Sequence, residues 1–186
     1  MTTNTLAKIR LHFRAPDAPL LEKIQFAIGS CVYGALLVAR SDDGICAIFL
    51  DDDSTKLEAQ LAGAFPESLR EESPSALKYD LEQVVTFINT PDQATQLDLV
   101  VGGTAYQQRV WEFLCRIPAG TTYSYTEIAE SLGDPDGARA VAGACAANVL
   151  AIAIPCHRVI RSDGSISGYR WGVERKRRLL EKERQQ

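Results

Sequence analysis

The sequence lacks the features that mark membrane, secreted and metal-dependent proteins. It contains no apolar run near the roughly 18–20 residues that span a bilayer, and its N-terminus lacks a basic segment followed by an apolar stretch, so neither a membrane anchor nor a signal peptide is expected. Its two histidines, His12 and His157, lie far apart, which disfavours a zinc site. The five cysteines are an odd number with no C-x-x-C pair, so no disulfide framework is expected. We therefore expect a soluble cytoplasmic protein that uses no metal and no cofactor.

The net charge is small but unevenly distributed. The 186 residues carry −4 at pH 7, which by itself argues against a nucleic-acid partner. Residues 1–101, however, hold 8 Lys and Arg against 15 Asp and Glu, a net −7, whereas residues 102–186 hold 12 against 9, a net +3. An acidic half joined to a basic half is typical of a chain whose basic part faces nucleic acid.

The first half is patterned as a small α/β layer. Residues 1–22 are interpreted as a leader or linker. The expected elements after them are strands at 24–28, 31–39 and 44–50, a helix after Ser54 that stops at Pro66, a polar loop at 69–75, a helix from 75 to about 89 and a strand at 97–101. Gly29-Ser30 is predicted to form the tight turn between the first two strands. This half contains no catalytic constellation, and Asp51–Asp53 is interpreted as a capped turn rather than a cation site.

The second half is mostly helical. An amphipathic helix is expected at 104–117, and Ser124 and Glu127 have capping-box spacing at the start of the next helix. A turn and an alanine-rich helix at 137–147 complete a helix-turn-helix layout at about 124–148, and a basic helix follows later. The predicted fold class is therefore α+β, with an N-terminal α/β domain of antiparallel strands and helices at 23–101 and a mostly helical C-terminal domain containing the helix-turn-helix at 102–186.

Cys156 is the one cysteine with chemically active neighbours. It is followed by His157 and Arg158. A free thiol needs a nearby cation, base or helix N-terminus to ionise at neutral pH, and these neighbours could supply one. Adjacent residues on an extended chain point to opposite faces, however, so the pair by itself also fits a structural cysteine.

Six short parts of the second half form a recognisable set. They are Tyr106-Gln107-Gln108-Arg109-Val110-Trp111, Ser124-Tyr125, Ala138-Arg139-Ala140-Val141, Asn148, Ile154-Pro155-Cys156-His157-Arg158-Val159 and Ser167-Gly168-Tyr169-Arg170-Trp171-Gly172. In this order and spacing they resemble the O6-alkylguanine-DNA alkyltransferase family, in particular the C-terminal, alkylguanine-repairing part of bacterial Ada proteins. The resemblance is strong over roughly 102–186 and looser before it, where it implies a ribonuclease-H-like domain.

The resemblance implies a DNA-repair methyltransferase that acts once. It would flip out O6-alkylguanine, mainly O6-methylguanine and also O4-methylthymine, and transfer the alkyl group irreversibly to its own cysteine. Cys156 would be the nucleophile and His157 the general base, acting through a water. Glu183 would orient His157, with Glu181 as the alternative, and Asn148 would brace the turn that leads to the cysteine.

The implied partner is double-stranded DNA, contacted in the minor groove by a monomer. The target base must leave the stack, and Arg139 would be the finger that fills the vacated space while Tyr125 pushes on the target's phosphate. The other implied roles are DNA contact for Thr126, Ala138 and Ser162, substrate pocket for Val159, Tyr169, Arg170 and Trp171, internal pairing for Arg158, and long-range attraction of DNA by the Arg175–Arg178 cluster. Because some family members have a small residue where Arg170 stands, the pocket is predicted to favour methyl over larger aryl-methyl groups.

Three other functions remain open on the sequence. One is a non-catalytic binder of damaged DNA, but such relatives replace the nucleophile, and Cys156 is present. A helix-turn-helix regulatory protein with a structural cysteine is the second; it would need a dimer, and no dimer face is visible. The third, a cysteine hydrolase, would need an oxyanion-hole motif that the sequence does not show.

Overall fold

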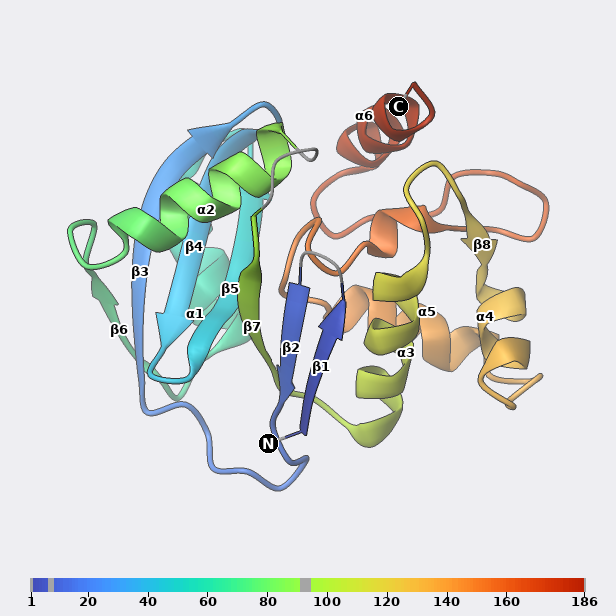
Figure 1. Ribbon diagram of the computed structural model, residues 1–186, viewed down its shortest axis with the longest axis horizontal. Coiled ribbons are helices and arrows are strands. Elements are labelled where there is room, and N and C mark those ends of the chain that lie inside the picture. Colours follow the sequence, from blue (N-terminus) through green and yellow to red (C-terminus); the bar gives the residue numbers. More distant parts are fainter. Residues whose placement is uncertain (1, 7–8, 91–94, 186) are drawn as a thin grey trace. The chain divides into compact units, whose positions relative to one another are not determined.

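The computed structural model describes residues 2–6, 9–90 and 95–185, and the chain divides into two compact units, 1–102 and 103–186 (Figure 1). Within the described residues, no helix is long and apolar enough to cross a membrane. The N-terminal unit is built on a seven-stranded sheet in the order β1-β2-β7-β5-β4-β3-β6. Its elements are β1 (Thr2–Leu6), β2 (Ile9–Phe13), β3 (Lys23–Cys31), β4 (Gly34–Ser41), β5 (Gly44–Asp51), the 3-10 turn η1 (Ser54–Lys56), α1 (Leu57–Ala64), β6 (Leu69–Glu72), α2 (Lys78–Asn89) and β7 (Leu97–Val101).

The core of this unit lies around β5. Every residue of β5 from Gly44 to Leu50 is buried, so the strand is covered on both faces. Figure 1 shows α2 in front of the sheet and α1 behind it. A strand that is buried on both faces has a continuous run of apolar residues instead of alternating apolar and polar ones. Ile45–Leu50 shows this continuous pattern. The acidic turn after β5 is capped as expected, since the Asp53 side chain accepts from the backbone of Thr55.

The sheet is mixed, whereas an antiparallel sheet was predicted. The pairs β1–β2, β3–β4 and β4–β5 are antiparallel, but β2–β7, β3–β6 and β5–β7 are parallel. The parallel pairs join strands that are separated by helices or long connections, because a crossover returns the chain in its original direction. The position of β7 between β2 and β5 therefore depends on contacts between distant parts of the chain, and the residue pattern within each strand does not predict it.

The predicted turn at Gly29-Ser30 is wrong. These residues continue β3, and the turn to β4 falls at Val32 and Tyr33, with Gly34 at φ +119°. Gly29 serves a different purpose, because a Cβ placed on it would lie only 3.0 Å from Cδ2 of Leu81 on α2. The glycine thus allows a helix to approach the sheet closely.

Two segments expected to lack regular structure contain strands. The interpretation of residues 1–22 as a leader differs from the structure, which has β1 and β2 there. In β2 the alternation of Ile9, Leu11 and Phe13, all buried, with polar residues is a period-two signal that sequence reasoning overlooked. The polar loop expected at 69–75 contains β6, a short edge strand whose exposed residues leave no hydrophobic pattern.

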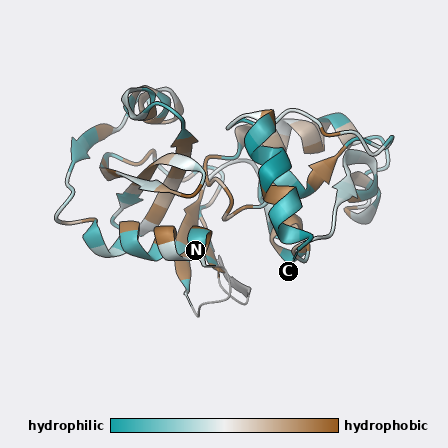
Figure 2. Cartoon of the chain, turned by 90° about the horizontal axis from the view of Figure 1, so that it is seen from above, coloured by the Kyte–Doolittle hydropathy of each residue, from teal (hydrophilic) through white to brown (hydrophobic). Residues whose placement is uncertain are grey.

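The C-terminal unit is mostly helical. Its elements are α3 (Ala105–Arg116), β8 (Tyr123–Ser124), α4 (Tyr125–Ser131), α5 (Ala138–Ala147), the 3-10 turn η2 (Cys156–Arg158), β9 (Val159–Ile160) and α6 (Val173–Glu183). The capping box of Ser124 and Glu127 is confirmed, with both reciprocal hydrogen bonds formed. β8 and β9 pair in parallel. Figure 2 shows α6 as mostly hydrophilic, interrupted by hydrophobic bands.

Helix α3 supports the α4–α5 pair. The indole Nε1 of Trp111 donates to the Ala144 carbonyl on α5 at 2.9 Å, and Arg109 Nη2 donates to the Leu132 carbonyl at the end of α4 at 2.6 Å. The turn between the two helices ends at Gly137, where an added Cβ would lie 2.2 Å from Asp134 Oδ2. A side chain at Gly137 would therefore displace the Asp134 carboxylate, which packs against the start of α5.

Candidate active site

Cys156 lies at the first position of η2 and is held by Asn148. The thiol residue is only 4% exposed, and Asn148 Nδ2 donates to its Sγ at 3.2 Å. The same amide group donates to the Ile154 carbonyl at 3.0 Å, while Asn148 Oδ1 accepts from the backbone of Leu150 at 2.8 Å. Ile152 between them has φ +65°, a conformation that a β-branched residue adopts only under constraint. Asn148 thus ties the end of α5 to the strained turn that presents Cys156.

Burial keeps the Cys156 thiol protonated at rest. Burial raises its pKa to about 11, against the opposing effects of the Asn148 hydrogen bond and the positive charge of Lys176. A thiol with such a pKa is a weak nucleophile at neutral pH, because the thiolate is the reactive form. Any reaction in which this thiol acts as a nucleophile would therefore need a base to take its proton.

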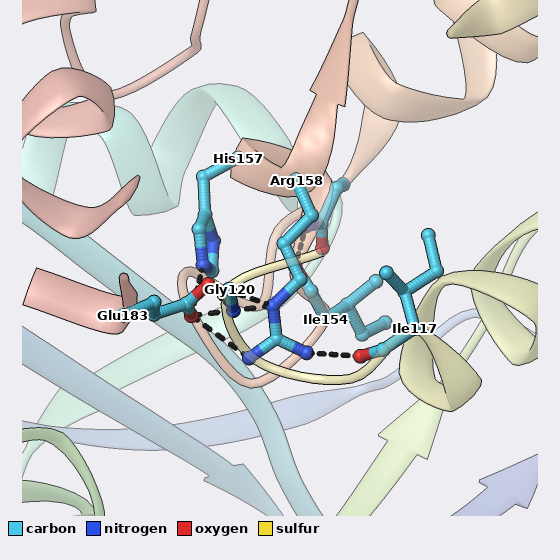
Figure 3. Close-up of polar contacts among 7 residues, drawn as sticks. Ile117, Gly120, Ile154, His157, Arg158 and Glu183 are labelled. Carbon is cyan, nitrogen blue, oxygen red and sulfur yellow. Dashed lines mark hydrogen bonds and ion pairs between the residues drawn. The ribbon is translucent and has the colours of Figure 1, made fainter. Parts of the chain in front are cut away.

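His157 and Arg158 converge on Glu183 at the end of α6 (Figure 3). His157 Nε2 lies 2.8 Å from Glu183 Oε1, and Arg158 donates to the same carboxylate from Nη2 at 2.8 Å and from Nε at 3.1 and 3.2 Å. The backbone of Gly120 donates to Oε2 at 3.3 Å, and Arg158 Nη1 donates to the Ile117 carbonyl. Burial opposes ionisation of Glu183, but hydrogen bonds from His157 and Arg158 outweigh it and lower its pKa to about 2.

The imidazole of His157 is neutral and has one nitrogen available. His157 is fully buried, and burial lowers its pKa although Glu183 acts in the opposite direction. An ionised carboxylate only accepts hydrogen bonds, so the proton is on Nε2 and Nδ1 carries a lone pair. Within the described part of the chain, Nδ1 is a buried atom without a hydrogen-bond partner. Such an atom in a buried polar site is a ready acceptor for a water.

A cavity of about 420 Å³ opens beside Cys156. It is lined by Tyr125, Ala142, Cys145, Ala146, Cys156, Gly168, Tyr169 and Arg170. Arg170 reaches across it, because its Nη1 donates to the Ala146 carbonyl near the end of α5 at 3.2 Å. Tyr125 donates from its hydroxyl to Ser167 Oγ at 2.7 Å. Cys145, on the last turn of α5, is half-buried and lines the cavity.

The other two residues assigned to the pocket from sequence support it from behind. The ring of Trp171, which is buried, packs edge-on against Tyr169 with ring centroids 5.2 Å apart, and Tyr169 meets His157 in the same way at 6.3 Å. The buried Val159 carbonyl accepts hydrogen bonds from Lys176 and Ser167. The two acceptor positions of this oxygen are thus used inside the protein.

Lys176 and Ser167 are residues that sequence reasoning missed. Lys176 was grouped with a basic cluster expected to attract DNA, but it is fully buried, and its Nζ donates to Val159 and to Ser167 Oγ at 2.8 Å. Burial lowers the pKa of Lys176 to about 8. Its spacing from Leu179, Leu180 and Glu183 places it on the inner face of α6, which is the signal that could have found it.

The residues assigned to DNA contact are distributed over α4, α5 and the segment after β9. Arg139 is exposed near the start of α5, and Ala138 beside it is half-buried. Thr126 Oγ1 on α4 and Ser162 Oγ lie within hydrogen-bond distance, at 3.3 Å. Within the described residues, no group of three or more His, Cys, Asp or Glu side chains is arranged to hold a metal ion.

Comparisons of the sequence with known proteins found one matching family and several similar proteins. The sequence profile of the family described as "6-O-methylguanine DNA methyltransferase, DNA binding domain" matches residues 105–185. The regulatory protein Ada of Salmonella typhimurium is 49% identical over 162 residues, which cover 87% of this chain and 46% of that protein. The methylated-DNA–protein-cysteine methyltransferase of Mycobacterium tuberculosis is 43% identical over 111 residues, covering 60% of this chain and 67% of that protein.

A solved structure of a relative also matches the fold of this chain. The crystal structure of Mycobacterium tuberculosis OGT in complex with DNA matches with a TM-score of 0.70 and 31% identity, over 87% of this chain and 93% of that one. Our chain spans about half the length of the Ada proteins that it matches.

Proposed function

The chain belongs to the O6-methylguanine DNA methyltransferase family, and on that premise we propose that it removes the alkyl group from O6-alkylguanine in duplex DNA and retains it on Cys156. O6-methylguanine is the main substrate of the proposed reaction, and O4-methylthymine a second one. The proposal draws support from relatives named as methylated-DNA–protein-cysteine methyltransferases and from the cavity beside Cys156.

The observation that carries the proposal is the unpartnered Nδ1 of the buried His157. With Nε2 held by Glu183, this imidazole can only accept a proton at Nδ1. A water between Nδ1 and the Cys156 sulfur would pass the thiol proton to His157, and ionised Glu183 would stabilise the imidazolium that forms. A structural cysteine would need no such base. The raised pKa of Cys156 explains why a base is required.

The transfer itself is a single displacement. The Cys156 sulfur forms a bond to the methyl carbon while the bond from that carbon to guanine O6 breaks, and the electron pair stays on the base. The departing guanine takes up a proton from solvent, and the thiol proton remains on His157 until it too is passed to solvent, so protons balance overall. The product is a thioether, in which sulfur has no proton to lose and is a poor leaving group. Each molecule therefore acts once.

The DNA-facing part of the proposal uses α4 and α5. A base cannot react at O6 while it is stacked, so the nucleotide is flipped out, which costs about a few kcal/mol. A cavity of about 420 Å³ lies within the range of pockets that hold small ligands, which suits one extruded base. Exposed Arg139 fills the vacated space from the minor groove, and the small residues around it on α5 permit a close approach. The protein acts as a monomer on double-stranded DNA.

The experiment that tests the function is label transfer. The protein is incubated with duplex DNA carrying O6-[methyl-³H]methylguanine, and the labelled residue is identified by peptide mapping. We expect one methyl group per protein on Cys156, loss of transfer in Cys156→Ala, and full transfer in the control Cys31→Ala, which alters a cysteine of the N-terminal unit. Binding to damaged DNA without transfer would replace the proposal with a damage-binding or regulatory role, and repeated turnover would also reject it.

A further inference from the structure

Cys145 is a second thiol in the cavity of Cys156, and the proposed alkyl transfer does not use it. It lies on the last turn of α5 and is half-buried. Asn148 connects the two cysteines, since its backbone N–H donates to the Cys145 carbonyl at 3.4 Å and its Nδ2 donates to the Cys156 sulfur at 3.2 Å. Both residues are among the eight that line the cavity of about 420 Å³. The cavity therefore presents two thiols within one small space.

We propose that Cys145 and Cys156 form a dithiol site that chelates trivalent arsenicals, uncharged compounds of the type R–As(OH)₂. Soft thiol donors prefer soft thiophilic centres. Among the described residues, none that lines the cavity carries a carboxylate that would favour a hard cation, and the alanine and tyrosine side chains suit an organic group on arsenic. The chelation needs no alkyl transfer, so this inference stands or falls independently of the proposed function.

The charges around the site favour an uncharged arsenical over a metal cation. Arg170 lines the cavity, and the buried Lys176 lies close enough for its charge to affect both thiols. Burial raises the pKa of Cys145 well above its usual range and that of Cys156 to about 11, so both are thiols at neutral pH. A metal ion would have to enter a positive field and displace two firmly held protons. An uncharged arsenical is not repelled by this field, and its two hydroxides carry the thiol protons away as water.

The condensation balances without an oxidant. Two As–O bonds break and two As–S bonds form, and each thiol proton leaves with a hydroxide as water. Arsenic remains trivalent throughout. Occupation of the two sulfurs would remove the nucleophile and fill the cavity, so an arsenical would also block entry of a base.

The test uses phenylarsine oxide and the full chain, with intact-protein mass spectrometry as the readout. We expect one phenylarsenic group per protein, retained in excess glutathione and released by 2,3-dimercaptopropanol, because only a dithiol competes with a two-point attachment. Cys145→Ser and Cys156→Ser should each bind about 10²–10⁴-fold more weakly, the loss expected when a two-point attachment becomes single. Cys115→Ser is the matched control, a half-buried cysteine of the same unit outside the cavity lining, and should bind like the wild type.

A second measurement needs no variant. Free thiols of the arsenical-bound protein are blocked with N-ethylmaleimide in urea, the arsenical is released, and the newly freed thiols are labelled and mapped. Labelling of Cys145 and Cys156 together supports the site. Three outcomes would each overturn the proposed dithiol site. They are labelling of Cys115 together with Cys156, retention of dithiol-specific binding by Cys145→Ser, and release of the arsenical by glutathione. If methyl transfer fails while the chelate forms at Cys145 and Cys156, the proposed function fails and this inference survives.

Discussion

Replacement of Glu183 by glutamine separates the role of its charge from that of its shape. The amide keeps an oxygen facing His157 Nε2 but removes the negative charge that Arg158 and a protonated His157 need. The pKa of Glu183 is lowered from 4.5 to about 2, and its side chain is only 13% exposed. At about 1.4 kcal/mol per unit, the folded state favours the ionised carboxylate by about 3 kcal/mol. We expect Glu183→Gln to lose that amount of unfolding free energy at pH 7, near the range for breaking a buried ion pair.

The pH dependence of this loss has a definite sign. Because the pKa of Glu183 is lower in the folded than in the unfolded protein, its contribution is complete above about pH 4.5 and disappears as the pH falls towards 2. The wild type and Glu183→Gln should therefore differ most in urea denaturation at pH 7 and converge below pH 3. The control is Glu181→Gln on the same helix, an exposed residue whose replacement should change stability by less than about 0.5 kcal/mol.

The rate of methyl transfer distinguishes a role of Glu183 in orienting His157 from a purely structural role, because a purely structural residue would affect stability but not this rate. Without the carboxylate, His157 is a weaker base, and single-turnover transfer at pH 7 should fall by about 10²-fold or more. The rate of the variant should then rise between pH 7 and 9, as hydroxide takes over removal of the thiol proton. If Glu183→Gln matches Glu181→Gln in stability and in rate, the assignment of Glu183 as the orienting acid is refuted.

Four further outcomes are expected. Asn148→Ala should lower the unfolding free energy by about 2–4 kcal/mol in urea denaturation, because it leaves buried backbone groups unpaired. Arg139→Ala should slow methyl transfer from duplex DNA by about tenfold or more while leaving reaction with the free base O6-methylguanine unchanged, since a finger in the vacated stack matters only in DNA. The unfolding free energy of the wild type relative to Lys176→Met should increase between pH 8 and 10.5, because the lowered pKa means that the unfolded state binds more protons there. O6-benzylguanine should inactivate the wild type more slowly than methylated DNA is repaired, and Arg170→Ala should narrow that difference; equal rates in the wild type would refute a crowded pocket.

Local signals in the sequence predicted local structure well. The capping box at Ser124 depends on two residues three positions apart, and the strand at 97–101 depends on its own composition; both are confirmed. The parallel pairings were missed because they are decided by the path of the chain between strands. The turn near Gly29 was misplaced because the sequence does not distinguish the two roles of a glycine. Gly29 leaves room for the Leu81 side chain to pack against the strand, and it does not form a turn.

The candidate site divides in the same way. Cys156 and His157 are adjacent, so their motif is visible in the sequence, whereas Glu183 was placed only by resemblance to a family. Lys176 was assigned to the surface because a lysine in a basic run usually is exposed. Its burial depends on Ser167 and the Val159 carbonyl, which come from other segments. The presence of Cys145 in the cavity likewise depends on how α5 is rotated, which composition does not specify.

The parallel pairing of β2 with β7 has a consequence for the order in which the chain folds. The partners Arg10 and Asp98 are 88 positions apart, whereas the antiparallel pairs β3–β4 and β4–β5 join strands that follow each other directly in the sequence. During synthesis the β3–β5 hairpins can therefore form early, while β2 waits for β7 with its apolar residues unpacked. The residues of β7, which complete the N-terminal sheet, are thus the last to be synthesised before the unit that carries Cys156. The sheet can therefore be completed only when synthesis of that second unit begins.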